Sequence, residues 1–270
     1  SGGAKHSFHK PTFSHDSPNF VDGDKAMAVH RELGDRIAKV RARIAKAAET
    51  SGRSIDDITL LGASKVQRPE LVAAAIEAGV TCLGENYVQE AAEKLPVVRA
   101  RLSAATPAAR PPRWHMIGAL QRNKAKIAVG LFDVIETVDR ASLANEINKR
   151  AGAQAKIVDI YLQVNLSREP QKAGVEETEL GHLLASCAAL EHVRVVGLMT
   201  IPAPVDNPAD NRPVFARLRE LRDALQAQPG GESLRGLSMG MSKDFEIAIE
   251  EGATVVRVGS DLFGPRPPKA

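Results

Sequence analysis

The chain has 270 residues, of which 43% are hydrophobic and 26% charged, and its formal net charge is +3. This composition is typical of a folded globular protein, and it excludes an intrinsically disordered chain, a collagen-like chain and a disulfide-rich scaffold. The small charge and an aromatic content of 4% argue against a nucleic-acid-binding surface, and no apolar run reaches the roughly 18 residues of a membrane-spanning helix.

The N-terminal residues 1–25 are rich in His, Ser, Pro and Asp and show no periodicity, which predicts a flexible tail. This segment has no apolar stretch of the kind that a secretory signal requires. The two cysteines, Cys82 and Cys187, lie in apolar sequence without a second Cys or a His at metal-ligand spacing. We therefore expect buried, reduced thiols, no metal site and a cytoplasmic location.

The segment Ala26–Thr50 has the spacing of an amphipathic helix that ends near Gly52. Its apolar residues recur every three or four positions, at Val29, Leu33, Ile37, Val40, Ile44 and Ala48.

After this helix, short β-branched or apolar runs alternate with helical stretches. The expected strands are Ile58–Lys65, Thr81–Tyr87, Trp114–Leu120, Val134–Val138, Ile157–Leu166, Val193–Ile201, Leu237–Met241 and Thr254–Phe263. The expected helices are Glu70–Ala78, Val88–Leu102, Lys124–Val129, Arg140–Arg150, Glu176–Leu190, Ala209–Gln228 and Phe245–Glu251. Strands that alternate with helices pair in parallel, and this number of units favours one α/β domain over 26–270, a (β/α)₈ TIM barrel. An open doubly wound sheet is the alternative.

The active site of such a barrel lies at the carboxyl ends of its strands, so polar residues there are candidates. Lys65 ends the first expected strand, where partial burial would lower the pKa of its amine and favour attack on an aldehyde. A solvated lysine at a strand end is the alternative. Asn86 and His115 lie at the ends of the second and third expected strands.

The segments around the last two strands are typical of a phosphate site. LSMGMS places Ser238, Gly240 and Ser242 just before a helix, with Ser242 as the expected N-cap. Free backbone amides and the helix dipole favour an anion there. Gly259 and Ser260, in VVRVGSD, offer further amides and a hydroxyl. A flexible turn with an ordinary cap is the alternative.

Arg257 lies between two valines of the eighth expected strand, so it points into the barrel if the valines pack under the helices. A buried arginine needs an acceptor, either a structural carboxylate or a ligand nitrogen. A nucleophilic lysine, a phosphate cradle and an inward arginine together suggest pyridoxal 5′-phosphate (PLP). A guanidinium at the pyridine nitrogen would leave that nitrogen unprotonated and the ring a poor electron sink.

Several segments resemble the YggS/PROSC family of pyridoxal phosphate homeostasis proteins. They are GASKV, GENYVQEA, WHMIGALQRNK, SREPQKAGV, GLMTI and LSMGMSKDFEIAIEEGATVVRVGSDLFGPR, and the resemblance extends from about Ala26 to Arg266. The family usually has AVSKT where this chain has GASKV, but the lysine is retained.

The resemblance implies a single barrel like the PLP-binding domain of fold-type III enzymes such as alanine racemase, with an added N-terminal helix. It implies that Lys65 forms the Schiff base with PLP and that Glu169, Lys172 and Gly174 lie on a loop over the mouth. The other residues that it implies around PLP are Asn86, His115, Ser238, Met239, Ser242, Arg257, Gly259 and Ser260.

Two functions remain to be weighed. An amino-acid racemase needs two bases on opposite faces of the substrate carbanion, and beside Lys65 only Tyr87 and Tyr161 are available as tyrosines. A carrier or regulator of PLP needs only to bind and release it. The resemblance favours the second function, intracellular PLP (vitamin B6) homeostasis without catalysis. It also favours a monomer, with PLP-dependent apo-enzymes as candidate acceptors.

Overall fold

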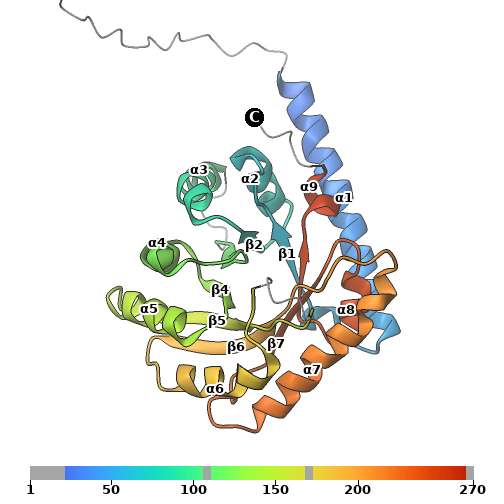
Figure 1. Cartoon of the computed structure of the whole chain (residues 1–270). Helices are drawn as coiled ribbons and strands as arrows, with labels where there is room; N and C mark the ends of the chain where they lie inside the picture. Colours follow the sequence, from blue (N-terminus) through green and yellow to red (C-terminus); the bar gives the residue numbers. More distant parts are fainter. Residues whose placement is uncertain (1–21, 106–110, 168–172, 266–270) are drawn as a thin grey trace, which may run out of the picture.

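The computed structural model describes residues 22–105, 111–167 and 173–265, whose strands form a closed parallel barrel with helices around it (Figure 1). The strands are β1 (Thr59–Ala63), β2 (Cys82–Glu85), β3 (Arg113–Met116), β4 (Val134–Val138), β5 (Val158–Gln163), β6 (Val193–Met199), β7 (Gly236–Met241) and β8 (Val255–Val258). Each strand pairs with the next, and β8 pairs with β1. The predicted barrel is therefore confirmed, and the open sheet is excluded.

The helices on the outside are close to the expected ones. They are α2 (Pro69–Glu77), α3 (Val88–Ala105), α4 (Ala125–Leu131), α5 (Ala141–Gly152), α6 (Glu177–Ala188), α7 (Arg212–Gln226) and α8 (Phe245–Glu250). Within the three described ranges, no helix is both long and apolar enough to cross a membrane.

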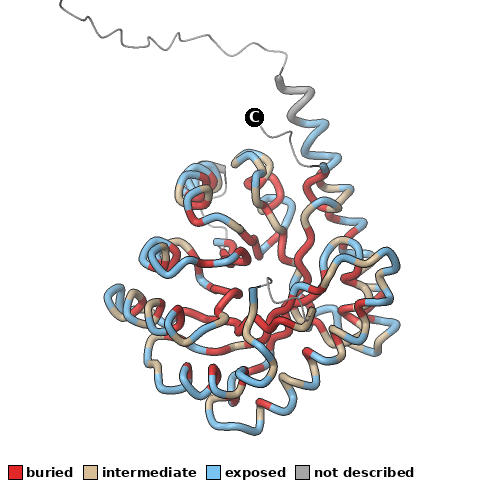
Figure 2. The backbone as a smooth tube through the Cα atoms, viewed as in Figure 1, coloured by how far each residue is buried: buried red, intermediate tan, exposed pale blue. Residues whose placement is uncertain are grey.

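The additional N-terminal helix, α1, spans Asp22–Thr50 and packs against α8 and α9 (Ser260–Phe263). Four of its expected apolar positions, from Leu33 to Ile44, are 1–3% exposed. Val29 is 47% exposed, because the first turns lie beyond the elements that α1 covers (Figure 2). Residues 22–25 belong to this helix and not to the predicted tail, and residues 1–21 lie outside the described residues.

The expected eighth strand, Thr254–Phe263, was too long. β8 ends at Val258, and Ser260–Phe263 form the short helix α9. Gly259, with φ −112° and ψ −78°, leaves the extended conformation and starts the turn. Leu262 and Phe263 are buried, so their apolar character reflects helix packing and not continuation of the strand.

The core has one layer between sheet and helices and a smaller one inside the barrel. The inner layer contains Leu61, Cys82, Ile117, Val134, Tyr161, Met199 and Val255. The Tyr161 ring fits because Gly197 and Gly236 lie opposite each other on β6 and β7. A Cβ atom on Gly197 would lie 2.3 Å from Tyr161 Cε1, and one on Gly236 would lie 2.5 Å from its hydroxyl.

Candidate functional site

The carboxyl ends of the strands carry most of the residues that the sequence predicted for a site. Lys65 comes shortly after β1, Asn86 directly after β2 and Ser242 directly after β7. Gly259 and Ser260 follow β8. Because all strands of a parallel barrel end at the same mouth, the fold brings these residues around one opening.

The backbone on both sides of Lys65 is fixed by side chains of α3. Lys94 Nζ donates a hydrogen bond to the Ser64 carbonyl oxygen at 2.8 Å, and the Val66 amide donates to Glu90 Oε1 at 2.6 Å. Val66 has φ +57°, a left-handed conformation that costs a β-branched residue about 1–3 kcal/mol. The half-buried Lys65 thus sits on a strained turn that its neighbours hold in place, as is common for functional residues.

A buried ion pair lies under this turn. Lys94 Nζ is 2.9 Å from Glu85 Oε1, and the two side chains are 5% and 0% exposed. Ser64 Oγ donates to the same carboxylate oxygen at 2.7 Å. Burial raises the pKa of Glu85, and Lys94 and Ser64 oppose that shift. Sequence reasoning missed Lys94, although its position four residues after Glu90 was the available signal.

Asn86 contains one of the few buried polar atoms that lack a partner. Its Oδ1 atom has no hydrogen bond within the described part of the chain. A buried acceptor of this kind costs about 1–3 kcal/mol if it stays unpaired, so it indicates a missing donor. Its place at the end of β2 agrees with the prediction that Asn86 lines a ligand pocket.

The turn after β7 leaves backbone amides without partners. Gly240 has φ +90°, and a Cβ atom there would lie 2.6 Å from the Ala248 Cβ atom, so only glycine fits. Among the described residues, none accepts a hydrogen bond from the amides of Ser242, Lys243 or Ser260. Such groups at adjacent strand ends are suited to hold an anion.

The predicted N-cap of α8 was wrong. Asp244 is the N-cap residue, and Ser242 lies two positions before it. Asp244 Oδ1 accepts a hydrogen bond from the Met241 amide at 2.7 Å, and Oδ2 accepts one from Asn211 at 2.8 Å. These contacts use both carboxylate oxygens outside the helix, so α8 begins without a side-chain cap.

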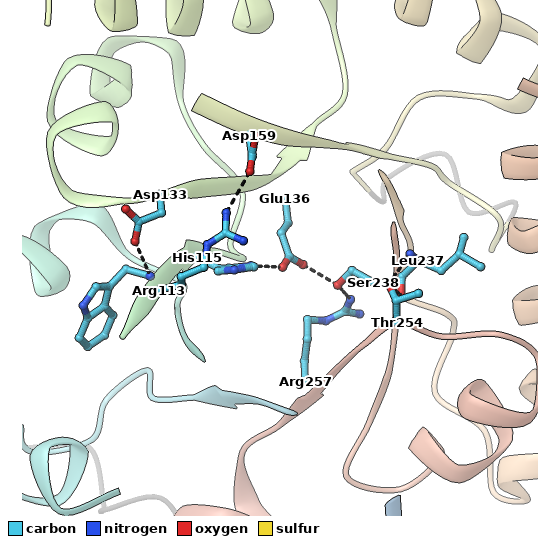
Figure 3. A network of polar contacts seen from close by, with 10 residues as sticks. Arg113, His115, Asp133, Glu136, Asp159, Leu237, Ser238, Thr254 and Arg257 are labelled. Carbon is cyan, nitrogen blue, oxygen red and sulfur yellow. Dashed lines mark hydrogen bonds and ion pairs between the residues drawn. The ribbon is translucent and has the colours of Figure 1, made fainter. Parts of the chain in front are cut away.

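Arg257 points into the barrel, as its alternation with the valines predicted, and it is 5% exposed. It donates to Ser238 Oγ at 2.6 Å and to the Thr200 carbonyl oxygen at 2.8 Å. Ser238 in turn donates to Glu136 Oε2 at 2.5 Å, and the other Glu136 oxygen lies 2.5 Å from His115 Nδ1. Figure 3 shows this continuous chain from His115 to Arg257.

In this network of hydrogen bonds, the positive charges of His115 and Arg257 lie on either side of the negative charge of Glu136. Glu136 was not among the predicted site residues. Burial disfavours the carboxylate, but His115, Arg257 and Ser238 together lower the pKa of Glu136. Burial also disfavours the imidazolium, but the Cys82 and Glu136 side chains raise the pKa of His115 to about 10. The pair is therefore ionic at neutral pH. The signal in sequence was a single acidic residue within the apolar run VIETV.

Two predicted site residues lie away from the mouth. Met239 is fully buried in the core outside the sheet, because it alternates with the inward Ser238. His115 is inside the barrel and lines a cavity near the opposite end, so Glu136 and Ser238 connect it to Arg257. Of the expected loop, Glu169 and Lys172 lie outside the described residues.

The barrel places the chain in the class of the alanine racemase N-terminal domain, whose family profile matches residues 63–267. Over 232 residues the chain is 44% identical to the pyridoxal phosphate homeostasis protein of Aquifex aeolicus, covering 86% of this chain and 97% of the relative.

Two solved structures share the fold. A protein from Bifidobacterium adolescentis described as unknown is 37% identical with a TM-score of 0.82, covering 87% of this chain and 96% of that one. PipY of Synechococcus elongatus, solved with PLP bound, is 34% identical with a TM-score of 0.73, covering 86% and 100%. The chain belongs to the pyridoxal phosphate homeostasis protein family, which confirms the resemblance seen in its sequence.

Proposed function

We propose that this protein binds PLP at the carboxyl mouth of the barrel and serves intracellular PLP homeostasis without catalysing a reaction of its own. The observation that carries the proposal is the strained turn that presents Lys65 at the same mouth as the partnerless amides of Ser242 and Ser260. The PLP-bound structure of PipY supports the same ligand.

The residues at the mouth fit the chemistry of PLP. Bound PLP supplies an aldehyde, a phosphate and a pyridine ring. Lys65 Nζ would bond to the aldehyde carbon, and the amides of Ser242, Gly259 and Ser260 would hold the phosphate. Asn86 Oδ1, which is buried without a partner, would accept a hydrogen bond from the 3-hydroxyl group of PLP. Apart from Lys65, this assignment uses groups that have no partner among the described residues.

Arg257 supports binding without catalysis. The Arg257 guanidinium would face the pyridine nitrogen. A guanidinium group only donates hydrogen bonds, so it cannot accept one from a protonated ring nitrogen. Burial lowers the pKa of Arg257, but Glu136 and Asp244 favour its charged form. A ring nitrogen that stays unprotonated withdraws few electrons, so a carbanion on a bound amino acid would gain little stabilisation.

The alternative, an amino-acid racemase, lacks a second base in the described residues. Tyr161 is packed among glycines inside the barrel and lines the cavity at the other end, and burial raises the pKa of its hydroxyl. Tyr87 is 57% exposed, and its hydroxyl bonds to none of the described residues. Tyr161 is thus at the end of the barrel away from Lys65, and Tyr87 is largely exposed to solvent.

We further propose a cytoplasmic monomer that delivers PLP to PLP-dependent apo-enzymes. Both cysteines are buried free thiols, which suits a reducing compartment. A carrier needs a mouth from which an acceptor can take PLP.

The test is a comparison of the wild type with Lys65→Ala and, as a control, the exposed lysine variant Lys126→Ala. Incubation with PLP is expected to give a visible absorption band with the wild type and the control but not with Lys65→Ala. Borohydride reduction and peptide mapping should place the label on Lys65; a label found only on another lysine would overturn the site.

Chiral chromatography of alanine incubated with the loaded protein tests the racemase alternative, since turnover above background would favour that function.

A further inference from the structure

A cavity of about 300 Å³ opens at the N-terminal end of the barrel, the end opposite Lys65. Its walls come from the starts of β3 to β8 and from the segment before β7. Its chemically useful residues are Arg113, Asp159, Tyr161, Ser233, Arg235 and Thr254, and we name it the basal cavity. The volume is at the lower end of the range for small-molecule pockets, which suits a ligand of a few heavy atoms.

The charge around the basal cavity is positive. Asp159 Oδ2 is 2.9 Å from an Arg113 nitrogen, and its Oδ1 accepts a hydrogen bond from Arg194 Nε at 2.8 Å (Figure 3 shows the Arg113 contact). Two guanidinium groups thus share one carboxylate. Arg235 also lines the cavity, and its guanidinium forms no ion pair with any described acidic residue. Three cations against one anion leave a surplus that attracts negative charge.

These guanidinium groups still have donors to offer. Arg113 and Arg194 have side chains that are 57% and 58% exposed, and each uses part of its five N–H groups on Asp159. The carboxylate holds Arg113 and Arg194 in place, so their remaining donors are positioned before a ligand arrives. Planar, pre-positioned guanidinium groups match the oxygen pairs of carboxylates and phosphates.

Tyr161 adds an independent observation. The residue is 7% exposed, it lines the cavity, and its hydroxyl makes no hydrogen bond to any described residue. Gly197 and Gly236 leave the space that its ring fills, so the hydroxyl has a fixed position beside Gly236 in the cavity wall. A nearly buried phenol with an unused donor and acceptor indicates a polar ligand group.

We propose that the basal cavity is a binding site for a small organic anion that carries a carboxylate or phosphate group. Arg235 and Arg113 bind the anionic group at the rim, and the Tyr161 hydroxyl bonds to a polar atom that reaches inside. Val134 and Val196 line the space between them. The site is at the end of the barrel away from the proposed PLP site and does not depend on it.

Calorimetric titration with inorganic phosphate at constant ionic strength tests the proposal. Because phosphate could also bind at the mouth, the parent protein carries Ser242→Asp and Ser260→Asp, whose carboxylates repel an anion from the backbone amides there. Binding is expected to remain in this parent. It should weaken about tenfold or more on adding Arg235→Gln, from the loss of a charged hydrogen bond, and about threefold to tenfold on adding Tyr161→Phe. The exposed-arginine control Arg31→Gln should leave it unchanged.

The variants are chosen to keep the fold intact. Arg235 is exposed, and Tyr161→Phe removes only the hydroxyl, so thermal unfolding should match that of the parent. Phosphate binding that disappears in the parent, or that persists at full strength in Arg235→Gln and Tyr161→Phe, would place the anion elsewhere and overturn the proposal. Absence of any phosphate heat in the wild type and the parent would overturn the choice of ligand class.

Discussion

Replacing Lys94 by Met should destabilise the protein by an amount that depends strongly on pH. In the wild type Lys94 neutralises Glu85, whose side chain is fully buried, and donates to the Ser64 carbonyl oxygen. Methionine has a similar length but no charge. Removing one partner of a buried pair typically costs about 3–5 kcal/mol, because the other charge is left in a medium of low polarity.

The loss of folding stability can be calculated from the protonation of Glu85. Without Lys94, the carboxylate avoids burying a charge by binding a proton. Relative to the unfolded chain this costs about 1.36 kcal/mol for each pH unit above the ordinary pKa of 4.5. The upper limit of this contribution is thus about 3.4 kcal/mol at pH 7 and about 0.7 kcal/mol at pH 5. The lost hydrogen bond to Ser64 adds about 1 kcal/mol at both pH values.

The direction of this pH dependence follows from the raised pKa of Glu85. Burial already raises the pKa of Glu85 in the wild type, and the loss of Lys94 raises it further. The folded variant therefore binds more protons than the unfolded chain over a wider range above pH 4.5, and its stability falls more than that of the wild type as pH rises through this range. Urea unfolding of the wild type and Lys94→Met at pH 5, 6 and 7 measures how the free energy of unfolding of each changes with pH. The double variant Glu85→Gln/Lys94→Met should lose the pH-dependent part. A loss below about 1 kcal/mol at pH 7, or one that does not change with pH, would refute the reasoning.

Two further predictions concern the barrel interior and the turn after β7. In Glu136→Gln, His115 keeps Cys82 but loses the carboxylate that helps raise its pKa to about 10, so proton NMR should show its imidazole titrating at a lower pH than in the wild type; an unchanged titration would contradict the ion pair. Gly240→Ala should cost about 1–3 kcal/mol in thermal unfolding, whereas the control Gly34→Ala on α1 should gain up to about 1 kcal/mol. Equal effects would contradict the steric argument.

The sequence predicted the barrel well because its signal is local and repeated. Every expected strand overlaps an observed one, and the expected and observed bounds of Val134–Val138 agree. The main error was at the end of the chain. Leu262 and Phe263 continue the apolar pattern of β8, but Gly259 turns the backbone into α9. An apolar residue shows that a segment is buried and does not show which kind of element buries it.

The candidate site was predicted in part. The positions of Lys65 and Asn86 after strands and of Arg257 inside the barrel agree with the prediction, because strand ends and strand alternation fix where such residues lie. Lys94 and Glu136 were missed, because each acts on residues far away in the chain: Glu136 contacts Ser238, 102 positions later. Met239 was placed beside the ligand although alternation with Ser238 puts it in the outer core.

The sequence by itself determined the parallel barrel, the mouth at which its strands end and the family to which the chain belongs. These follow from periodicity and short motifs, which need no knowledge of distant contacts. Only the tertiary structure decided which polar groups are paired. It showed that Lys94 and Glu90 hold the turn around Lys65, that Glu136 joins His115 to Arg257, and that a basic cavity lies at the other end. Pairing depends on which strands meet across the barrel, so no local pattern records it.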